Sequence, residues 1–257
     1  MGLFAGVLAG MFGIGGGIVI VPALEAACGV FGVDAAIRMH IAIATSLAVI
    51  IPTSMASALA HYRRDSVDLD IIFRWSLFVM LGSLTGASIA SLVDSKVLAL
   101  VFAGLALLTS IKLILFPENR SMTKEIPRAV WVPVIPFVIG KFSTMMGVGG
   151  GTFSVIALTL FNRPIHRAVG TAALFGLIIS LPGAIAFVIS GIDDPRTPPG
   201  NLGYVSFAAF ALITPCTVLT APVGARIAHA FSERRLSILF GFISLIASAR
   251  LFYRAFA

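Results

Sequence analysis

The sequence alternates long apolar stretches with short polar ones. Five uncharged runs, at residues 41–60, 75–93, 142–162, 168–192 and 197–225, are long enough for spanning helices, which need about 18 to 20 apolar residues. Inside a bilayer the chain must satisfy its own backbone N–H and C=O groups, and helices of this length do so. The pattern therefore predicts an all-α polytopic membrane protein.

A glycine-rich motif interrupts the apolar pattern twice, at residues 12–17 and 146–151. Glycine costs about 1 kcal/mol relative to alanine inside a helix, and it permits positive φ and close approach to the backbone. Non-helical backbone is tolerated at membrane depth only where protein or a wet cavity surrounds it. Each motif is therefore either a crowded bend or a binding loop. Its recurrence favours the binding loop.

Three ordered matches predict that the chain is a duplication. Residues 86–102 match 224–240 at an offset of 138, the glycine motifs match at 134, and residues 40–45 match 166–171 at 126. We therefore expect two homologous repeats, each with a glycine-broken or re-entrant helix and three further transmembrane helices. Repeat 1 covers residues 1–116, a polar linker covers 117–128, and repeat 2 covers 129–257.

The basic residues favour repeats that are inverted in the membrane. Parallel repeats, in which each broken helix crosses, divide lysine and arginine more evenly between the two faces. Inverted repeats, in which the chain turns back at the glycines, leave five basic residues on one face: Arg38, Lys96, Arg196, Arg250 and Arg254. Because basic residues concentrate in cytoplasmic loops, this asymmetry favours inversion. Inverted repeats with discontinuous helices are typical of secondary transporters.

Composition excludes several other classes of protein. The chain is 58% hydrophobic and 11% charged, with a mean hydropathy of +1.04, whereas soluble domains carry roughly 25% charged residues. The net charge of +7 comes from short loops between apolar runs, so we expect no nucleic-acid partner. Cys28 and Cys216 lie in apolar stretches and predict packed thiols. We expect no metal site, and no hydrolase or redox motif indicates an enzyme.

Several motifs together resemble the TauE/SafE family of sulfite exporters, also called toluene sulfonate uptake permeases. They are Gly13–Gly17 with Pro22 downstream, Ala44-Thr45-Ser46 with Gly170-Thr171-Ala172, Gly203-Tyr204-Val205, and Gly224-Ala225-Arg226. The resemblance covers nearly the whole chain. It implies transport of sulfite, a sulfonate or a related sulfur-containing anion across the bacterial inner membrane, with no cofactor. The resemblance does not determine the substrate, the direction of transport, the coupling ion or the oligomeric state.

The predicted substrate site lies between the two glycine motifs, where backbone N–H groups and half-helix N-termini suit an anion. Lys141 lies near bilayer depth and either attracts the anion or extends to the interface. Nearby hydroxyls can donate hydrogen bonds to the anion or bond their own backbone. The predicted substrate-binding residues are Gly13, Gly15, Gly16, Gly17, Thr45, Ser46, Lys141, Gly147, Gly149, Gly150, Gly151, Thr152 and Thr171.

His40 and His166 occupy equivalent positions in the repeats, each five residues before a threonine. Histidine titrates near neutral pH and can carry a proton alongside an anion, although a histidine at a helix start can instead satisfy loop carbonyls. We therefore predict a secondary transporter that works by alternating access, with these two residues as proton-coupling candidates. The alternatives are a structural or assembly subunit without transport activity and a transporter of another small anion.

Overall fold

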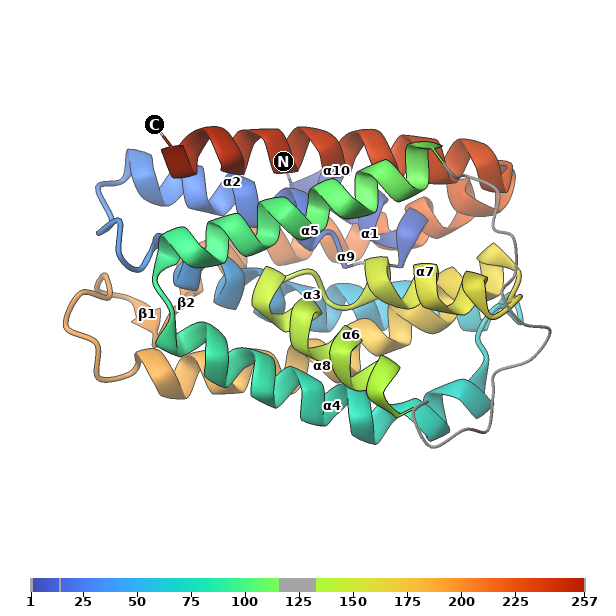
Figure 1. Ribbon diagram of the computed structural model, residues 1–257, viewed down its shortest axis with the longest axis horizontal. Coiled ribbons are helices and arrows are strands. Elements are labelled where there is room, and N and C mark those ends of the chain that lie inside the picture. The colour runs from blue at the N-terminus through green and yellow to red at the C-terminus, as the bar shows by residue number, and fades with distance from the viewer. Residues whose placement is uncertain (1, 14, 116–132, 257) are drawn as a thin grey trace.

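The computed structural model describes residues 2–13, 15–115 and 133–256, which form ten helices and one short β-hairpin (Figure 1). Six of these helices are long and apolar enough to cross a membrane, which confirms the predicted all-α polytopic class. In chain order the elements are α1 (Gly2–Phe12), α2 (Gly17–Val30), α3 (Arg38–Tyr62), α4 (Leu69–Leu92), α5 (Ser95–Leu115), α6 (Val134–Met146), α7 (Gly151–Leu160), α8 (Ile165–Gly191), β1 (Asn201–Leu202), β2 (Val205–Ser206), α9 (Phe207–Ala230) and α10 (Glu233–Phe256).

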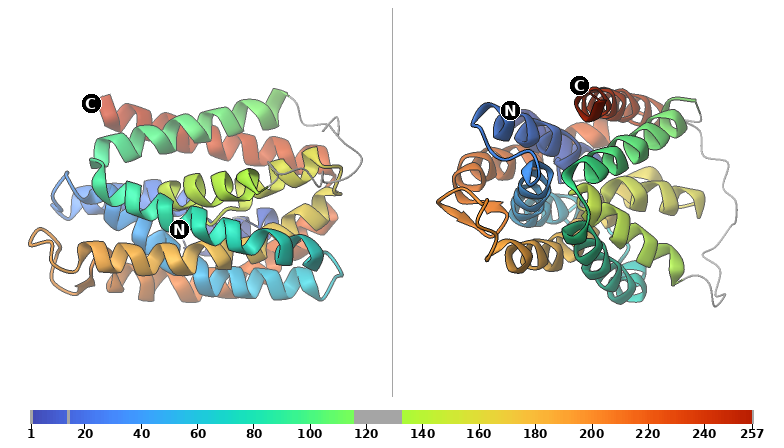
Figure 2. Two further views of the ribbon diagram at one scale, coloured as in Figure 1. Left: turned by 60° about the horizontal axis from the view of Figure 1, so that its bottom comes forward. Right: turned by 60° about the vertical axis from the view of Figure 1, so that its left-hand side comes forward.

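The helices lie side by side in one bundle, and their connections gather at its two ends (Figures 1 and 2). The Tyr62 end, at the right of Figure 1, holds connections 63–68, 161–164 and 231–232. The Asp194 end, at the left, holds connections 31–37, 93–94 and 192–206. The last of these contains the hairpin.

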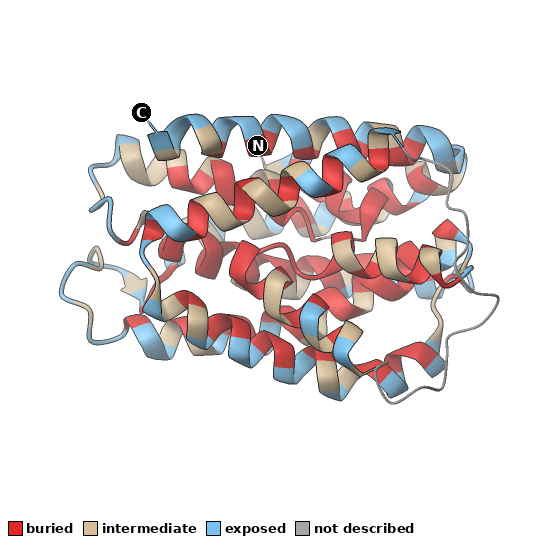
Figure 3. Cartoon of the chain, viewed as in Figure 1, coloured by how far each residue is buried: buried red, intermediate tan, exposed pale blue. Residues whose placement is uncertain are grey.

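Helix α3 lies at the centre of the bundle and α9 at its edge. The most apolar stretch of α3 is 72% buried and that of α9 is 17% buried, and Figure 3 shows the exposed positions on the outer faces of the bundle. Many of those exposed side chains are large and apolar, among them Phe73, Leu92 and Leu212. An exterior with many large apolar side chains suits contact with lipid.

Both glycine motifs fold the chain back on itself. A methyl group added at Gly16 would lie 2.7 Å from the carbonyl oxygen of Ala5 in α1, and Val148 N–H donates to the Ser143 carbonyl oxygen in α6. Helices α1 and α2 therefore run in opposite directions, as do α6 and α7 (Figure 1). The break at residues 147–150 divides the apolar run 142–162 between two short helices, as expected of a glycine-broken helix.

Contacts in the first half of the chain recur in the second half. Asp68 and Ser206 cap α4 and α9 with side chains that accept from Ile71 N and Ala209 N, as N-cap residues do. A methyl group at Gly86 would meet the Lys141 carbonyl oxygen, and one at Gly224 would meet that of Val7. The two caps and the two glycines are each related by the offset of 138, and Val7 and Lys141 are related by the offset of 134.

Helices α3 and α8, which occupy equivalent places in the two halves, run antiparallel. Gly170 lies against His61, Gly176 against Ser54, and Gly183 against Leu47. The five basic residues that the inverted scheme places together all lie toward the Asp194 end. Inversion across the bilayer stays a prediction, and so do the repeat boundaries. The predicted linker over residues 117–128 lies outside the described residues.

Candidate functional site

The two glycine breaks touch each other near the middle of the bundle. A methyl group added at Gly17 would lie 2.2 Å from the Gly147 carbonyl oxygen and 2.7 Å from the Val148 Cα. Gly16 and Gly150 have φ values of 81° and 79°, a region that side chains other than glycine rarely adopt. This contact is consistent with the prediction that the two breaks lie together. It also leaves no room for a side chain at Gly17.

Helices α2 and α7 both begin at the breaks and run away from them toward opposite ends (Figure 1). The first amides of a helix have no intrahelical acceptor, and the helix dipole places partial positive charge there. Val19 N and Ile20 N both bond back to the carbonyl oxygen of Gly16, and Ser154 N bonds back to that of Gly150. The amides that precede Val19 in α2 and Ser154 in α7 therefore form two positive ends that meet near the middle of the bundle.

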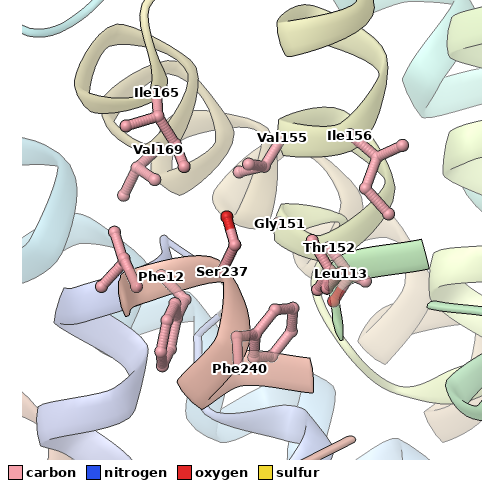
Figure 4. Close-up of a pocket in the computed structure, with 11 residues that line it drawn as sticks. Phe12, Leu113, Gly151, Thr152, Val155, Ile156, Ile165, Val169, Ser237 and Phe240 are labelled. Atoms are coloured by element: carbon pink, nitrogen blue, oxygen red, sulfur yellow. The ribbon is translucent and has the colours of Figure 1, made fainter. Parts of the chain in front are cut away.

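A small cavity of about 20 Å³ lies beside the second break (Figure 4). Gly151 and Thr152 line it from the first turn of α7, and Phe12 lines it from the last turn of α1. The Ser237 hydroxyl points into it from α10. A space of this size holds about one water molecule, so the described conformation is closed around the breaks.

Several hydroxyls around the breaks are buried and, among the described residues, have no hydrogen-bond partner. They belong to Ser54, Ser143, Thr152 and Ser180. Ser54 lies against Gly176, which in turn is close to the Gly149 carbonyl oxygen, and the Ser143 hydroxyl lies close to Gly150. Because buried polar atoms are nearly always paired, unpaired hydroxyls beside two helix N-termini are donors available to a ligand.

The hydroxyls of Thr45 and Thr171 both hold the start of another helix. Thr45 Oγ1 accepts from Ser206 N and Thr171 Oγ1 accepts from Asp68 N, each at 2.9 Å. Ser46 Oγ donates to the Gly147 carbonyl oxygen at 2.8 Å. All three side chains are fully buried. The structure thus brings Ser46 to the breaks, whereas Thr45 and Thr171 make equivalent contacts with α9 and α4.

Lys141 and His40 make local contacts. Lys141 is half-buried, and its Nζ lies 5.9 Å from the centre of the Phe142 ring; it does not line the cavity beside the second break. The Nε2 atom of His40 lies 3.1 Å from the carbonyl oxygens of Ala90 and Val93. His40 therefore satisfies carbonyls at the end of α4, which is the second of the two readings that the sequence left open.

His166 belongs to a group of rings at the Tyr62 end that sequence reasoning missed. Its ring stacks on that of His229 with centroids 5.0 Å apart, and the His61 ring lies 5.5 Å from that of His229. No sequence spacing relates these three residues. Ser54 and Ser180, by contrast, differ by 126, the offset that relates His40 to His166, so the repeat itself could have identified them.

A charged cluster closes the loop at the Asp194 end. Arg196 Nη2 lies 2.7 Å from Asp194 Oδ2, and the Tyr204 hydroxyl donates to the same oxygen at 2.8 Å. The hydrogen bonds from Arg196 hold the pKa of Asp194 well below its usual range. Burial, together with the bond to Asp194, raises the pKa of Tyr204 to about 12. The cluster therefore ties the hairpin to the 192–200 loop over the physiological pH range.

Comparison with known proteins identifies the family. The family described as sulfite exporter TauE/SafE matches residues 1–251. The chain belongs to the TauE/SafE family. A probable membrane transporter protein of Haemophilus influenzae is 31% identical over 88% of this chain and 85% of its own length. One from Bacillus subtilis is 30% identical over 74% of this chain and 77% of its own.

A more distant relative in Methanocaldococcus jannaschii, also a probable membrane transporter protein, is 24% identical over 93% of this chain and 88% of its own. No solved structure matches the chain. TauE/SafE membership and the six apolar helices establish a multi-pass membrane protein of a transporter family. The resemblance inferred from the glycine motifs is thereby confirmed.

Proposed function

We propose that the protein is a secondary transporter that binds sulfite, a sulfonate or a related sulfur oxyanion between the two glycine breaks. One observation supports this proposal most strongly: α2 and α7 both begin at the glycine breaks, and the backbones of the two breaks are in contact. Two positive helix ends and free amides form a binding surface for an anion without placing a full charge in the bilayer.

The unpaired hydroxyls supply the second part of the proposed site. Ser54 and Ser180 come from equivalent positions of α3 and α8, and Thr152 comes from the first turn of α7. A tetrahedral or pyramidal oxyanion presents several acceptor oxygens, and hydroxyls can bond these without adding charge. Ser46 supports the site indirectly by fixing the Gly147 carbonyl group.

Transport then requires the closed conformation to open. The cavity of about 20 Å³ cannot hold an oxyanion, so the helices around the breaks must separate toward one end at a time. Helices α3 and α8 run antiparallel through the centre, and rocking one half of the bundle against the other would expose the breaks alternately. This is the alternating-access mechanism expected of a secondary transporter.

A ligand panel tests the proposal on detergent-purified protein. Sulfite, methanesulfonate, sulfate, phosphate and chloride are added separately at matched ionic strength, and the unfolding temperature is measured. A ligand that binds only the folded state stabilises it by RT ln(1 + L/Kd), where L is the free ligand concentration, so tighter binding raises the unfolding temperature more. We expect sulfite or the sulfonate to raise the unfolding temperature in the parental protein and not in a Ser54→Val, Ser180→Val double variant. Stabilisation by chloride or phosphate alone would contradict the sulfur-anion assignment.

A further inference from the structure

Three of the four histidines in the chain meet at the Tyr62 end, although they lie far apart in the sequence. His61 comes from the last turn of α3, His166 from the first turn of α8, and His229 from the last turn of α9. The His229 ring lies between the other two, 5.5 Å from His61 and 5.0 Å from His166. We call these three residues the histidine cluster.

The histidine cluster joins the two halves of the bundle. His61 Nε2 donates to the Gly10 carbonyl oxygen at 3.0 Å, so α1 and α3 of the first half meet α8 and α9 of the second half through these rings. His61 is 1% exposed. The cluster therefore closes the Tyr62 end directly beside α1, whose last residues lead into the first glycine break.

Two ring nitrogens of the histidine cluster are buried and unpaired among the described residues: His61 Nδ1 and His229 Nε2. Each is a position at which an imidazole can accept a proton. Burial and nearby positive charge disfavour a protonated ring, so these rings should gain their protons only below the pH at which an exposed imidazole titrates. The arrangement provides proton acceptors where the two halves meet.

One charged group outside the histidine cluster acts on its rings: the field of Arg64, in the connection after α3, reaches both His61 and His229. Arg167 follows His166 on α8, Arg226 lies one turn before His229 on α9, and α1 carries no titratable side chain. Asp65 follows Arg64 on the exposed connection. A proton added to His61 or His229 is therefore repelled by Arg64.

We propose that the histidine cluster is a proton-binding latch that holds the Tyr62 end closed when its rings are neutral and releases it when they are protonated. Neutral rings can pack together at the observed distances. Protonated rings at the same distances would repel each other and Arg64. Release would part α1 and α3 from α8 and α9 and open a path to the breaks. The role of the latch in transport rests on the proposed function, but its response to protons does not.

The test measures access to the closed end without any substrate. In a Cys28→Ser, Cys216→Ser background, a single cysteine replaces Ser57, which is 1% exposed and lies one turn before His61. Its rate of modification by a membrane-impermeant thiol reagent in detergent is divided by that of a Ser232→Cys variant, whose cysteine lies at an exposed position of the same end. The ratio removes the effect of pH on thiol chemistry itself.

We expect the ratio to rise at least about fivefold between about pH 7 and pH 4.5, because buried imidazoles next to positive charge gain their protons below the range of an exposed histidine. The rise should disappear in His229→Gln and in His166→Gln, and gel filtration checks that both variants remain folded. A ratio that does not change with pH would overturn the latch. So would a rise that survives in both variants but is lost in His40→Gln, which would place the proton site at the other end.

The same variants separate the latch from the proposed transport. Anion counterflow in liposomes, which needs no net proton movement, reports transport alone. Counterflow with a constant accessibility ratio would contradict the latch and leave the transporter assignment intact. A pH-dependent ratio without counterflow of any sulfur oxyanion would support the latch and contradict the proposed function.

Discussion

Ser46 on α3 donates a hydrogen bond of 2.8 Å to the carbonyl oxygen of Gly147 in the second glycine break. The two residues are 101 positions apart in the sequence and belong to different predicted repeats. Because the Ser46 hydroxyl is fully buried, water cannot replace it as the donor. This bond therefore fixes a backbone group of the proposed site from the opposite half of the molecule.

Removing that hydroxyl should destabilise the protein. In Ser46→Ala the Gly147 carbonyl oxygen loses its donor, and a buried polar group left unpaired costs about 1 to 3 kcal/mol. The matched control is Ser88→Ala, because the exposed Ser88 hydroxyl bonds only to its own helix; its effect should stay within about 0.5 kcal/mol. Denaturant unfolding in detergent measures both. Equal stability of the two variants would show that the Ser46 bond contributes nothing.

Thr45→Val and Thr171→Val should each lower the free energy of unfolding by about 1 kcal/mol, since each removes the acceptor of a partly buried backbone N–H. Thr85→Val is the control, because the exposed Thr85 hydroxyl bonds only within α4. The prediction that these threonines also contact the anion is tested by the KM for flux at equal amounts of folded protein. An unchanged KM in the double variant would limit both residues to positioning α9 and α4.

The bond from Tyr204 to Asp194 predicts a pH dependence of stability. The pKa of the tyrosine is raised from its ordinary value of 10.0 to about 12 in the folded protein. Its contribution is therefore complete below pH 10 and is lost as the pH rises through the folded value. Tyr204→Phe should be less stable than the parental protein below pH 10, and the difference should shrink toward pH 12. A difference that is constant across this range would contradict the bond.

Cysteine labelling decides whether the two ends lie on opposite faces with the Tyr62 end in the cytoplasm. Ser66 is buried, so the exposed positions Arg63 and Pro199 carry the single cysteines in a background without Cys28 and Cys216. Because the Asp194 end has few basic residues, the positive-inside rule places it outside. An impermeant reagent added to intact cells should label Pro199→Cys and spare Arg63→Cys. Labelling of both from outside would contradict the inverted arrangement.

Much of the architecture could be predicted from the sequence, because the properties that determine it are local. Apolar length identifies α3, α4 and α8, and four glycines in five positions locate both breaks. The run 142–162 has the length of a spanning helix, but the glycines within it break the helix, as the motif indicated. The offsets between the halves also relate the two N-caps, Asp68 and Ser206, although their different side chains hid the match.

The partners of individual side chains were less predictable, since they depend on how distant segments pack. His166 has the same position in its repeat as His40, yet it stacks on His229 of α9, whereas His40 satisfies carbonyls at the end of α4. Likewise, Thr45 and Thr171 recur because each holds the N-cap of another helix. A repeated residue thus identifies an equivalent position without fixing its role.

The most direct test of the central claim measures sulfite or sulfonate counterflow in liposomes for Gly17→Ala and Gly104→Ala. A methyl group at Gly17 would meet the second break at 2.2 Å, whereas nothing lies within 4 Å of one at Gly104 in α5. If the touching breaks form the transport site, Gly17→Ala should lose at least about tenfold in rate, because small misplacements at a site have effects of this size. Gly104→Ala should keep the parental rate. Parental flux in folded Gly17→Ala, or no sulfur-anion flux in the parental protein, would contradict the account.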